Sequence, residues 1–351
     1  MTFTQLRGHM IFILLGLFIL ASAPVWCLPA DGVTPLNDRE YVRAVHLLFQ
    51  NAKTNIRVMA YQAFFYEEFP DSDSNGFIVD LIDARKRGVE VWFFLETSNW
   101  DQNLERQNRD YARRLEEGGI KVLWDHQEIT SHQKVIIVDD YATIISSNNW
   151  SHFSLWMNYE VAALVWSRPV AHDFSEFLND LLKQAGHEPL PKTEASKHIS
   201  AEEIGYVMLP AVDVLSSNNR DYFPMVSKAF HEAGEHIRVL QRSANYSTMM
   251  PGYARDKQIA EGEEISQVNT LLKDMIDADN RGVDVQVILE GEVRKRASTG
   301  EWKVTRDNED FAMRLLGGGV PVWYDSLTTQ THAKMVIVDD LTVVGSTNWT
   351  L

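Results

Sequence analysis

The chain contains two copies of one sequence unit, and this duplication constrains its fold more than any other feature. Residues 81–96 (LIDARKRGVEVWFFLE) recur as residues 275–290 (MIDADNRGVDVQVILE), and residues 111–148 recur as residues 311–348 without a gap. The offset between the copies grows along the chain because the second copy carries insertions. Since each copy of a repeat is normally one structural unit that packs against its neighbour, we expect two related halves.

Each copy alternates short apolar runs with amphipathic stretches. In the first copy, strand-like runs at 56–60 and 89–95 flank a helical stretch that ends at Arg87-Gly88, and the second copy repeats this order with Arg281-Gly282. Glycine at this position is typical of a helix C-cap. Alternation of strands and helices favours a largely parallel sheet with helices on both faces. We therefore predict the α/β class, with two tandem α/β/α repeats on mostly parallel or mixed sheets.

The first thirty residues have the pattern of an export signal. Arg7 precedes an uncharged apolar run at 10–23, which is as long as the core of a secretory signal and short for a membrane-spanning helix. If the run extended to Leu28, it would act instead as an uncleaved membrane anchor. We expect a secreted, periplasmic or lumenal protein with a signal peptide at 1–30, and the membrane-anchored form is the less favoured alternative.

The predicted halves are 31–185 and 206–351. Between them, residues 186–205 are mainly polar, contain two prolines and show no sustained apolar period, so we expect a linker there.

The charge balance limits the partners of the protein. The sequence has 33 Lys and Arg against 49 Asp and Glu, a net charge of −16. Sequence-independent binding to nucleic acid depends on many contacts between cations and phosphates, so a general nucleic-acid binder is disfavoured. The single cysteine excludes an internal disulfide and any multi-cysteine metal site.

Each copy ends in the same pattern of reactive side chains, His-x-Lys-x4-Asp. These residues are His132, Lys134 and Asp139 in the first copy, and His332, Lys334 and Asp339 in the second. A histidine and a lysine two positions apart on a strand point to the same face, so an imidazole lies beside a fixed cation. This arrangement suits a phosphate group. Asp139 and Asp339 begin Asp-Asp pairs that would also form good turns.

Hydroxyl and amide side chains follow each motif at equal spacing. They are Ser146 and Asn148 in the first copy, and Ser346 and Asn348 in the second. Such groups bind phosphoryl oxygens, although the two serines are equally suited to stabilising their own loops.

Together these residues resemble the phospholipase D superfamily, whose signature is His-x-Lys-x4-Asp followed six residues later by Gly-Ser-x-Asn. The second copy has every element, including Gly345, whereas the first has Ile145 in place of glycine. The first copy also continues into Ser154, Asn158 and Glu160, which resemble the trailing Ser, Asn and Glu of the family. The counterpart of Glu160 would fall at position 360, so we expect the chain to be truncated after its second motif.

The resemblance implies two repeats packed about a pseudo-twofold axis with one shared active site and no metal or other cofactor. One histidine would attack phosphorus to give a phosphohistidine, and the other would protonate the leaving alcohol. The resemblance favours His132 as nucleophile and His332 as general acid. A carboxylate would hold each ring in its productive tautomer, and the sequence leaves Asp139, Asp339 and Glu160 as candidates.

Three hypotheses remain for the substrate. The first is a phospholipase D-like hydrolase or transphosphatidylase that acts on phospholipids at a membrane surface, which suits an exported acidic chain. The second is a secreted nuclease, although the longest basic runs in the predicted mature chain are Arg85-Lys86-Arg87 and Arg294-Lys295-Arg296. The third is an inactive phosphate- or lipid-binding homologue, suggested by Ile145 and the expected truncation. Because both motifs lie in one chain, we expect a monomer.

Overall fold

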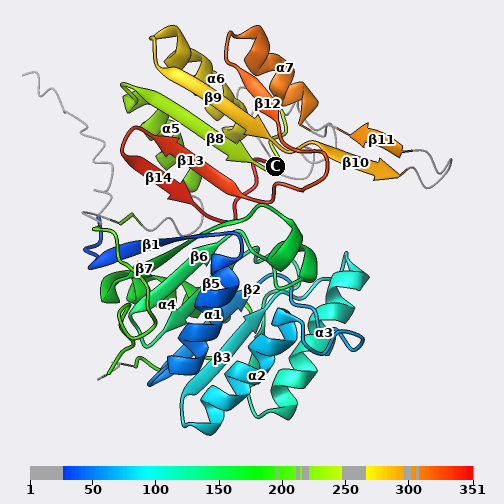
Figure 1. Ribbon diagram of the computed structural model, residues 1–351, viewed down its shortest axis with the longest axis vertical. Helices are drawn as coiled ribbons and strands as arrows, with labels where there is room; N and C mark the ends of the chain where they lie inside the picture. The colour runs from blue at the N-terminus through cyan, green and yellow to red at the C-terminus, as the bar shows by residue number, and fades with distance from the viewer. Residues whose placement is uncertain are drawn as a thin grey trace, which may run out of the picture.

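The computed structural model consists of two α/β units stacked one above the other (Figure 1). It describes residues 27–193, 197–210, 214–215, 221–246, 266–295, 302–305 and 308–350. Residues 1–26 of the predicted export signal lie outside the described residues. No helix in the described part of the chain is long and apolar enough to cross a bilayer.

The first unit is built on a seven-stranded mixed sheet. The order of its strands is β1 (Gly32–Asn37), β7 (Val161–Trp166), β6 (Ala142–Ser146), β5 (Lys134–Val138), β2 (Asn55–Ala60), β3 (Glu90–Leu95) and β4 (Lys121–Trp124). Only β2, β3 and β4 are mutually parallel, and every other pair of neighbours is antiparallel. The α/β class with mixed sheets is confirmed. A largely parallel sheet is not found, because a tight turn after β5 returns the chain directly into its antiparallel neighbour β6.

Helices cover both faces of this sheet. The helices α1 (Glu40–Asn51), α2 (Asp73–Lys86) and α3 (Gln102–Glu117) contribute to one apolar core, and α4 (Arg168–Gln184) contributes to the other. Alternate residues of β5 enter the two cores, Ile136 with the first and Ile137 with the second. All five residues of β5 are buried. The strand that begins at Lys134 is therefore anchored from both sides.

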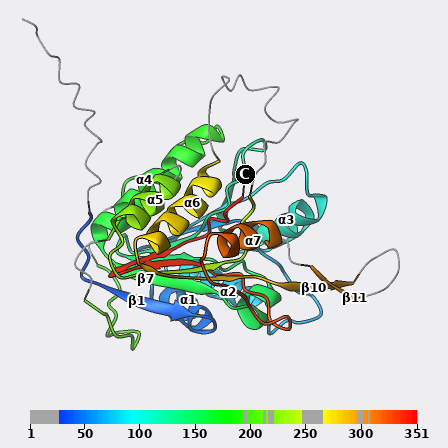
Figure 2. The ribbon, with the colours of Figure 1, turned by 90° about the horizontal axis from the view of Figure 1, so that it is seen from above.

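The second unit repeats the central part of the first. Its five-stranded sheet has the order β12 (Val322–Tyr324), β9 (Asp284–Leu289), β8 (His236–Gln241), β13 (Lys334–Val338) and β14 (Leu341–Val344). The helices α5 (Tyr222–Glu232), α6 (Gln267–Asn280) and α7 (Glu309–Gly317) pack on one face. The strands β10 (Glu292–Lys295) and β11 (Trp302–Thr305) form a separate hairpin that projects from the body of the unit (Figure 2). Since β8, β9 and β13 correspond to β2, β3 and β5, the two motifs occupy equivalent strands.

The glycines expected to end helices do so in both units. Gly88 follows α2 and Gly282 follows α6, with φ values of 92° and 93°. Glycine adopts this left-handed conformation without a steric penalty, so the predicted C-caps are confirmed.

The predicted linker packs onto the first unit. Ile199, Ala201 and Ile204 are buried in the same core as α1 and α2. Beyond the predicted linker, Leu209 pairs with Val33 of the edge strand β1. These apolar residues have no helical or strand period among their polar neighbours, which is why the sequence suggests only a linker. The segment joins the two units and completes the core of one.

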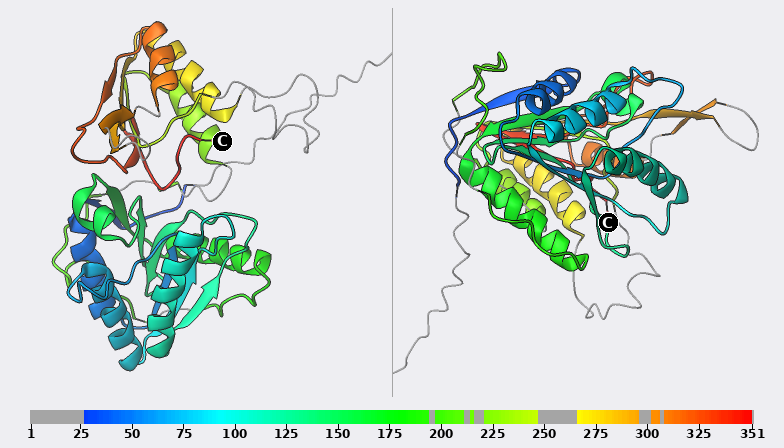
Figure 3. Two further views of the ribbon diagram at one scale, coloured as in Figure 1. Left: turned by 90° about the vertical axis from the view of Figure 1, so that its right-hand side faces the viewer. Right: turned by 90° about the horizontal axis from the view of Figure 1, so that it is seen from below.

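The two units meet through backbone pairing next to the motifs. The N–H of Tyr159 donates to the carbonyl oxygen of Gln330 at 2.9 Å, and the carbonyl oxygen of Tyr159 accepts from the N–H groups of His332 and Ala333, also at 2.9 Å. The described chain ends on the side of the second unit that faces the first (Figure 1 and Figure 3). The residues around both motifs therefore lie at the boundary between the units.

Candidate active site

Each motif lies at the start of its strand, where a histidine and a lysine are buried together. Lys134 and Lys334 are the first residues of β5 and β13, and their side chains are buried. The ammonium group of Lys134 donates to the carbonyl oxygen of His132 at 3.1 Å, and that of Lys334 donates to the carbonyl oxygen of His332 at 2.6 Å. Since a buried ammonium group needs an acceptor, these bonds hold each cation beside its histidine.

Each imidazole also bonds to the opposite unit. Nδ1 of His332 lies 3.0 Å from Oε2 of Glu160, and Nδ1 of His132 lies 3.0 Å from the carbonyl oxygen of Ser346. Both partners are acceptors, so each Nδ1 carries the proton and each Nε2 keeps a lone pair. The structure thus brings His132, His332 and Glu160 together in one site, as the pseudo-twofold arrangement predicts.

Glu160 is held as a carboxylate by donors from its own unit. The hydroxyl groups of Ser147 and Ser154 donate to its two oxygens, and the amide of Asn158 donates to Oε1 at 3.4 Å. Burial acts to raise the pKa of Glu160, but the charge of His332 and these hydrogen bonds outweigh it and keep the pKa below its usual value. Of the three candidate carboxylates, the structure places Glu160 against an imidazole.

Asp139 and Asp339 lie at the far ends of β5 and β13, and this position corrects the expectation that they orient the imidazoles. The carboxylate of Asp139 accepts N–H bonds from Lys53, Thr54, Asn55 and Ile199, and that of Asp339 accepts from Gly234, Glu235 and His236. Both residues have positive φ, 56° and 47°, at the turn after the strand. A strand rises about 3.3 Å per residue, so the whole strand separates each Asp from its histidine.

Burial lowers the pKa values of the basic groups at the site. Burial, with further positive charges nearby, lowers the pKa of His332 to about 4 and that of Lys334 to about 7. It also lowers the pKa values of His132 and Lys134 well below their usual values. The carboxylate of Glu160 opposes this effect at His332 and at both lysines, but it does not outweigh burial. An anionic ligand would restore their charge, because it supplies the missing negative charge.

The predicted phosphate-binding residues lie beside the motifs. The hydroxyl of Ser146 donates to the carbonyl oxygen of Lys134 at 3.4 Å, and Ser346 contributes its carbonyl oxygen to His132 at 3.0 Å. The amide oxygens of Asn148 and Asn348 are buried without a hydrogen-bond partner among the described residues. Tyr61, Lys134 and Asn148 line one small cavity. A phosphate role for these serines and asparagines stays a prediction.

Two acidic residues close to each motif were not identified as site residues from the sequence. The N–H of Ser131 donates to Oε2 of Glu96 at 2.6 Å and to Oδ2 of Asp125 at 3.2 Å. Burial, together with the neighbouring Asp125, raises the pKa of Glu96 to about 10. The available signal was the repeat itself, since the two acids recur as Glu290 and Asp325.

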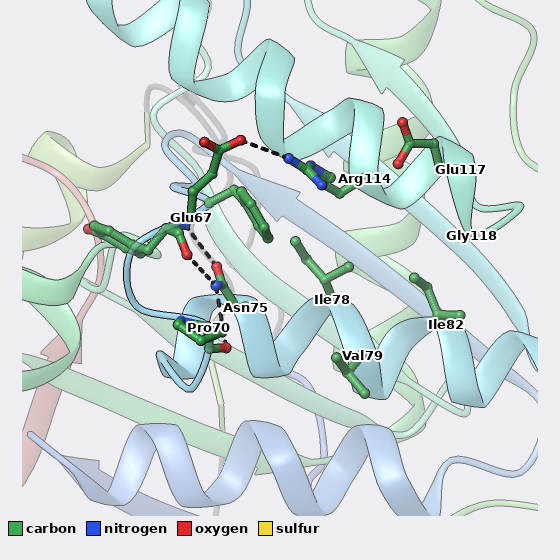
Figure 4. Close-up of a pocket in the computed structure, with 11 residues that line it drawn as sticks. Glu67, Pro70, Asn75, Ile78, Val79, Ile82, Arg114, Glu117 and Gly118 are labelled. Carbon is green, nitrogen blue, oxygen red and sulfur yellow. Dashed lines mark hydrogen bonds and ion pairs between the residues drawn. The ribbon is translucent and has the colours of Figure 1, made fainter.

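A separate pocket opens between α2 and α3, away from the motifs (Figure 4). Its volume is about 410 Å³, and its walls include Ile78, Val79 and Ile82. Arg114 lies at this pocket and forms an ion pair with Glu67 at 3.1 Å. None of the motif residues lines this pocket. Across the described ranges of the chain, no group of three or more His, Cys, Asp or Glu side chains has a geometry that could hold a metal ion.

Two α/β units of this topology, with paired His and Lys residues at their boundary, define a member of the phospholipase D superfamily. Comparison of the sequence with family models confirms this class. The chain belongs to the family described as the cardiolipin synthase, phospholipase D-like domain, which matches residues 46–182 and 237–351.

Two curated relatives are cardiolipin synthases A. That of Proteus mirabilis (strain HI4320) is 26% identical over 111 residues, which cover 32% of this chain and 23% of the relative. That of Buchnera aphidicola subsp. Acyrthosiphon pisum (strain APS) is 30% identical over 82 residues, which cover 23% of this chain and 17% of the relative. The chain therefore spans about a fifth of the length of these relatives.

A solved structure with a TM-score above 0.5 shows the same fold over most of this chain. The phosphatidylserine synthase of Haemophilus influenzae Rd KW20 superposes with a TM-score of 0.58 at 16% identity, covering 90% of this chain and 77% of that chain. The phospholipase D family member Nuc of Salmonella typhimurium is 27% identical, with a TM-score of 0.37. The match covers 43% of this chain and 94% of the Nuc chain.

Proposed function

We propose that the protein is a phosphodiesterase of phospholipase D type that hydrolyses or transphosphatidylates phospholipids through a phosphohistidine. The observation that carries the proposal is the crossed pair of imidazole contacts, His332 to Glu160 and His132 to Ser346. These contacts bring two histidines and two buried lysines from different repeats to one boundary, as a single phosphodiester site requires.

In the proposed first step, Nε2 of His132 attacks phosphorus, and the bond from phosphorus to the headgroup oxygen breaks. His332 in its protonated form gives the Nε2 proton to that oxygen, so the headgroup leaves as an alcohol. Lys134 and Lys334 neutralise the non-bridging oxygens, and the amides of Asn148 and Asn348 bind them. The carboxylate of Glu160 stabilises the imidazolium of His332, as a negative group behind a catalytic histidine does.

In the proposed second step, water or another alcohol attacks the phosphohistidine. His332, now neutral, takes the proton of the attacking hydroxyl, and the bond between phosphorus and His132 breaks. Water yields phosphatidic acid, and an alcohol yields a new phospholipid. The enzyme returns to its starting protonation state.

Phospholipid is the favoured substrate because of the surface beside the site. Phe153, Trp156 and Met157 belong to the π-helical turn η1 (Phe153–Met157), and they are 64%, 43% and 52% exposed. This turn leads directly to Asn158 and Glu160, so its apolar side chains would meet the acyl region of a lipid layer. A nucleic-acid substrate would instead encounter a protein with a net charge of −16. The family and the names of the curated relatives agree with a phospholipid.

The test is to incubate the protein with phosphatidylcholine, cardiolipin and single-stranded DNA, and to measure released choline, phosphatidic acid and nucleotides. The proposal expects lipid products that disappear in the His132→Ala/His332→Ala double variant, whose folding is checked by circular dichroism. Nucleotides without lipid products would favour the nuclease hypothesis, and no product from any substrate would favour an inactive homologue.

We also propose that residues 1–30 direct export and that the protein acts as a monomer. The amino-terminal sequence of the secreted form and its mass by light scattering would test these two points. An unprocessed membrane-bound form would support the anchor alternative instead.

A further inference from the structure

Arg242 lies at the site on the side of the second motif. It directly follows Gln241, the last residue of β8, and Gln241 pairs with Lys334 in the sheet. The carbonyl oxygen of Arg242 accepts from the amide of Asn308 at 2.9 Å, and the next residue, Ser243, accepts from the N–H of Trp349 at 2.8 Å. The backbone of Arg242 is therefore held between the start of β13 and the segment that carries Asn348.

Tyr61 occupies the equivalent position in the first unit. It follows Ala60, which pairs with Lys134 as Gln241 pairs with Lys334. The ring of Tyr61 lies 4.6 Å from the imidazole ring of His132, and the ammonium of Lys134 lies 4.8 Å from the ring centre of Tyr61. A side chain at this position thus reaches both reactive groups of its motif. The second unit places a guanidinium where the first places an aromatic ring.

The guanidinium of Arg242 has no anionic partner in the described part of the chain. Its Nε is buried and makes no hydrogen bond there. The charge of Arg242 helps to lower the pKa values of His332 and Lys334, after the larger effect of burial, as a neighbouring cation does. A partly buried cation without a counter-ion is costly, so this position is suited to receive an anionic group of a ligand.

We propose that Arg242 binds an anionic group on the headgroup of the phospholipid, next to the scissile phosphate, and thereby makes the enzyme prefer anionic headgroups. This inference rests on the proposed function, in which His332 protonates the leaving headgroup. Arg242 follows the strand residue that pairs with Lys334 of the second motif, and its charge also acts on Lys134 of the first. Since His332 of the second motif protonates the leaving group in the proposed reaction, the inference assigns the guanidinium to the headgroup and not to the diacylglycerol. Arginine binds phosphate or carboxylate through two parallel N–H donors, so either anion would serve.

The experiment compares the wild type with Arg242→Gln, Arg242→Lys and the control Arg238→Gln in mixed detergent micelles. Arg238 is on the same strand, but its guanidinium pairs with Asp284. The substrates are cardiolipin, whose leaving group carries a phosphate, phosphatidylserine, whose headgroup carries a carboxylate, and phosphatidylcholine, whose headgroup has no anion of its own. A comparison of cardiolipin with phosphatidylserine distinguishes a phosphate from a carboxylate as the anion that Arg242 binds.

We expect Arg242→Gln to lower kcat/KM about tenfold or more for cardiolipin, phosphatidylserine or both, mainly through KM, because a charged hydrogen bond is lost. Phosphatidylcholine should change by less than about twofold, Arg242→Lys should keep part of the preference, and Arg238→Gln should match the wild type. Thermal unfolding of each variant shows whether it is folded.

Equal losses on all three lipids would make Arg242 a general part of the site and overturn the inference, as would no loss on any lipid. Single-stranded DNA is assayed in parallel as a fourth substrate. A loss confined to its cleavage would assign the guanidinium to a nucleic-acid phosphate and also overturn the inference. If wild type cleaves phosphatidylcholine but shows no headgroup preference that depends on Arg242, only this inference fails. If wild type cleaves no phospholipid, the proposed function fails and the inference fails with it.

Discussion

Glu160 of the first unit holds the imidazole of His332 in the second, with 3.0 Å between Oε2 and Nδ1. The residue before Glu160, Tyr159, pairs through its backbone with Thr331, the residue before His332. Two neighbouring contacts thus join the same short segments, one through the backbone and one through the side chains. Docking of the two units and assembly of the site are therefore one structural event.

Replacement of Glu160 should distinguish the effect of its negative charge on activity from the effect of its hydrogen bonds on stability. Glu160→Gln keeps an oxygen for the Nδ1–H of His332 but removes the negative charge, so we expect kcat to fall about 100-fold or more. Glu160→Ala should also destabilise the fold by about 3 kcal/mol or more, since it leaves buried donors unpaired. Initial rates and urea unfolding measure the two effects. Glu176→Gln, on the exposed surface of α4, is the matched control, and unchanged activity of Glu160→Gln would contradict the proposed role.

Alanine variants of the two histidines should be blocked at different steps of the proposed reaction. If His132 is the nucleophile, His132→Ala forms no covalent adduct, whereas His332→Ala still forms one from a nitrophenyl phosphodiester, whose leaving group needs no proton. Acid-labile phosphohistidine, trapped by rapid quenching and detected by mass spectrometry, measures this difference. The reverse pattern would exchange the two roles.

Anion binding should weaken as the pH rises through the pKa of Lys334, which burial lowers to about 7. Below this pH the ammonium of Lys334 is charged in the free protein, and above it the charge is lost. At higher pH the binding of an anion is therefore coupled to the uptake of a proton by Lys334. A dialkyl phosphate, which stays a monoanion, should bind more tightly at about pH 6 than at about pH 9 and take up protons at the higher pH. Calorimetry in two buffers measures both quantities.

The control for this prediction is Lys334→Arg, which keeps its charge throughout this range and should bind with a weaker dependence on pH. Equal affinities of the wild type at the two pH values would show that Lys334 keeps its proton in the free site.

Glu96 should contribute more stability at low pH than at neutral pH. Its pKa is raised to about 10 in the folded protein, so the folded state holds a proton that the unfolded state releases above its ordinary pKa of 4.5. The contribution is therefore complete below about pH 4.5 and decreases as the pH rises. Glu96→Gln is neutral at every pH and should unfold in urea with a weaker pH dependence than the wild type.

Glu96→Ala provides the structural comparison for that prediction. It removes the acceptor of the Ser131 N–H and should cost about 1–3 kcal/mol. If Glu96→Gln and the wild type show the same pH dependence, Glu96 is not protonated in the folded state.

Activity should persist in the presence of a chelator. In the proposed reaction Lys134 and Lys334 supply the positive charge that a metal ion provides in other phosphodiesterases. Rates before and after dialysis against EDTA measure the effect. Loss of activity that zinc or calcium restores would refute the mechanism in this form, unless calcium acts only by increasing binding to lipid surfaces.

The sequence by itself determined the features that depend on short spacings. The alternation of apolar and polar residues identifies the α/β class, and the repeated motif identifies His132, Lys134, His332 and Lys334 as a duplicated set. Patterns of this kind reflect the period of a strand and the conformation of a turn, which neighbouring residues set. The two motifs could therefore be found without knowledge of the fold.

Only the tertiary structure decided how distant residues meet. Glu160 and His332 are 172 positions apart, and nothing in the spacing of either residue distinguishes Glu160 from Asp139 or Asp339 as the partner of an imidazole. Arg242 lies far from any motif in the sequence and reaches the site only because β8 pairs with β13. Such contacts depend on how sheets pair and units dock, and the energy of docking is spread over many residues that carry no local pattern.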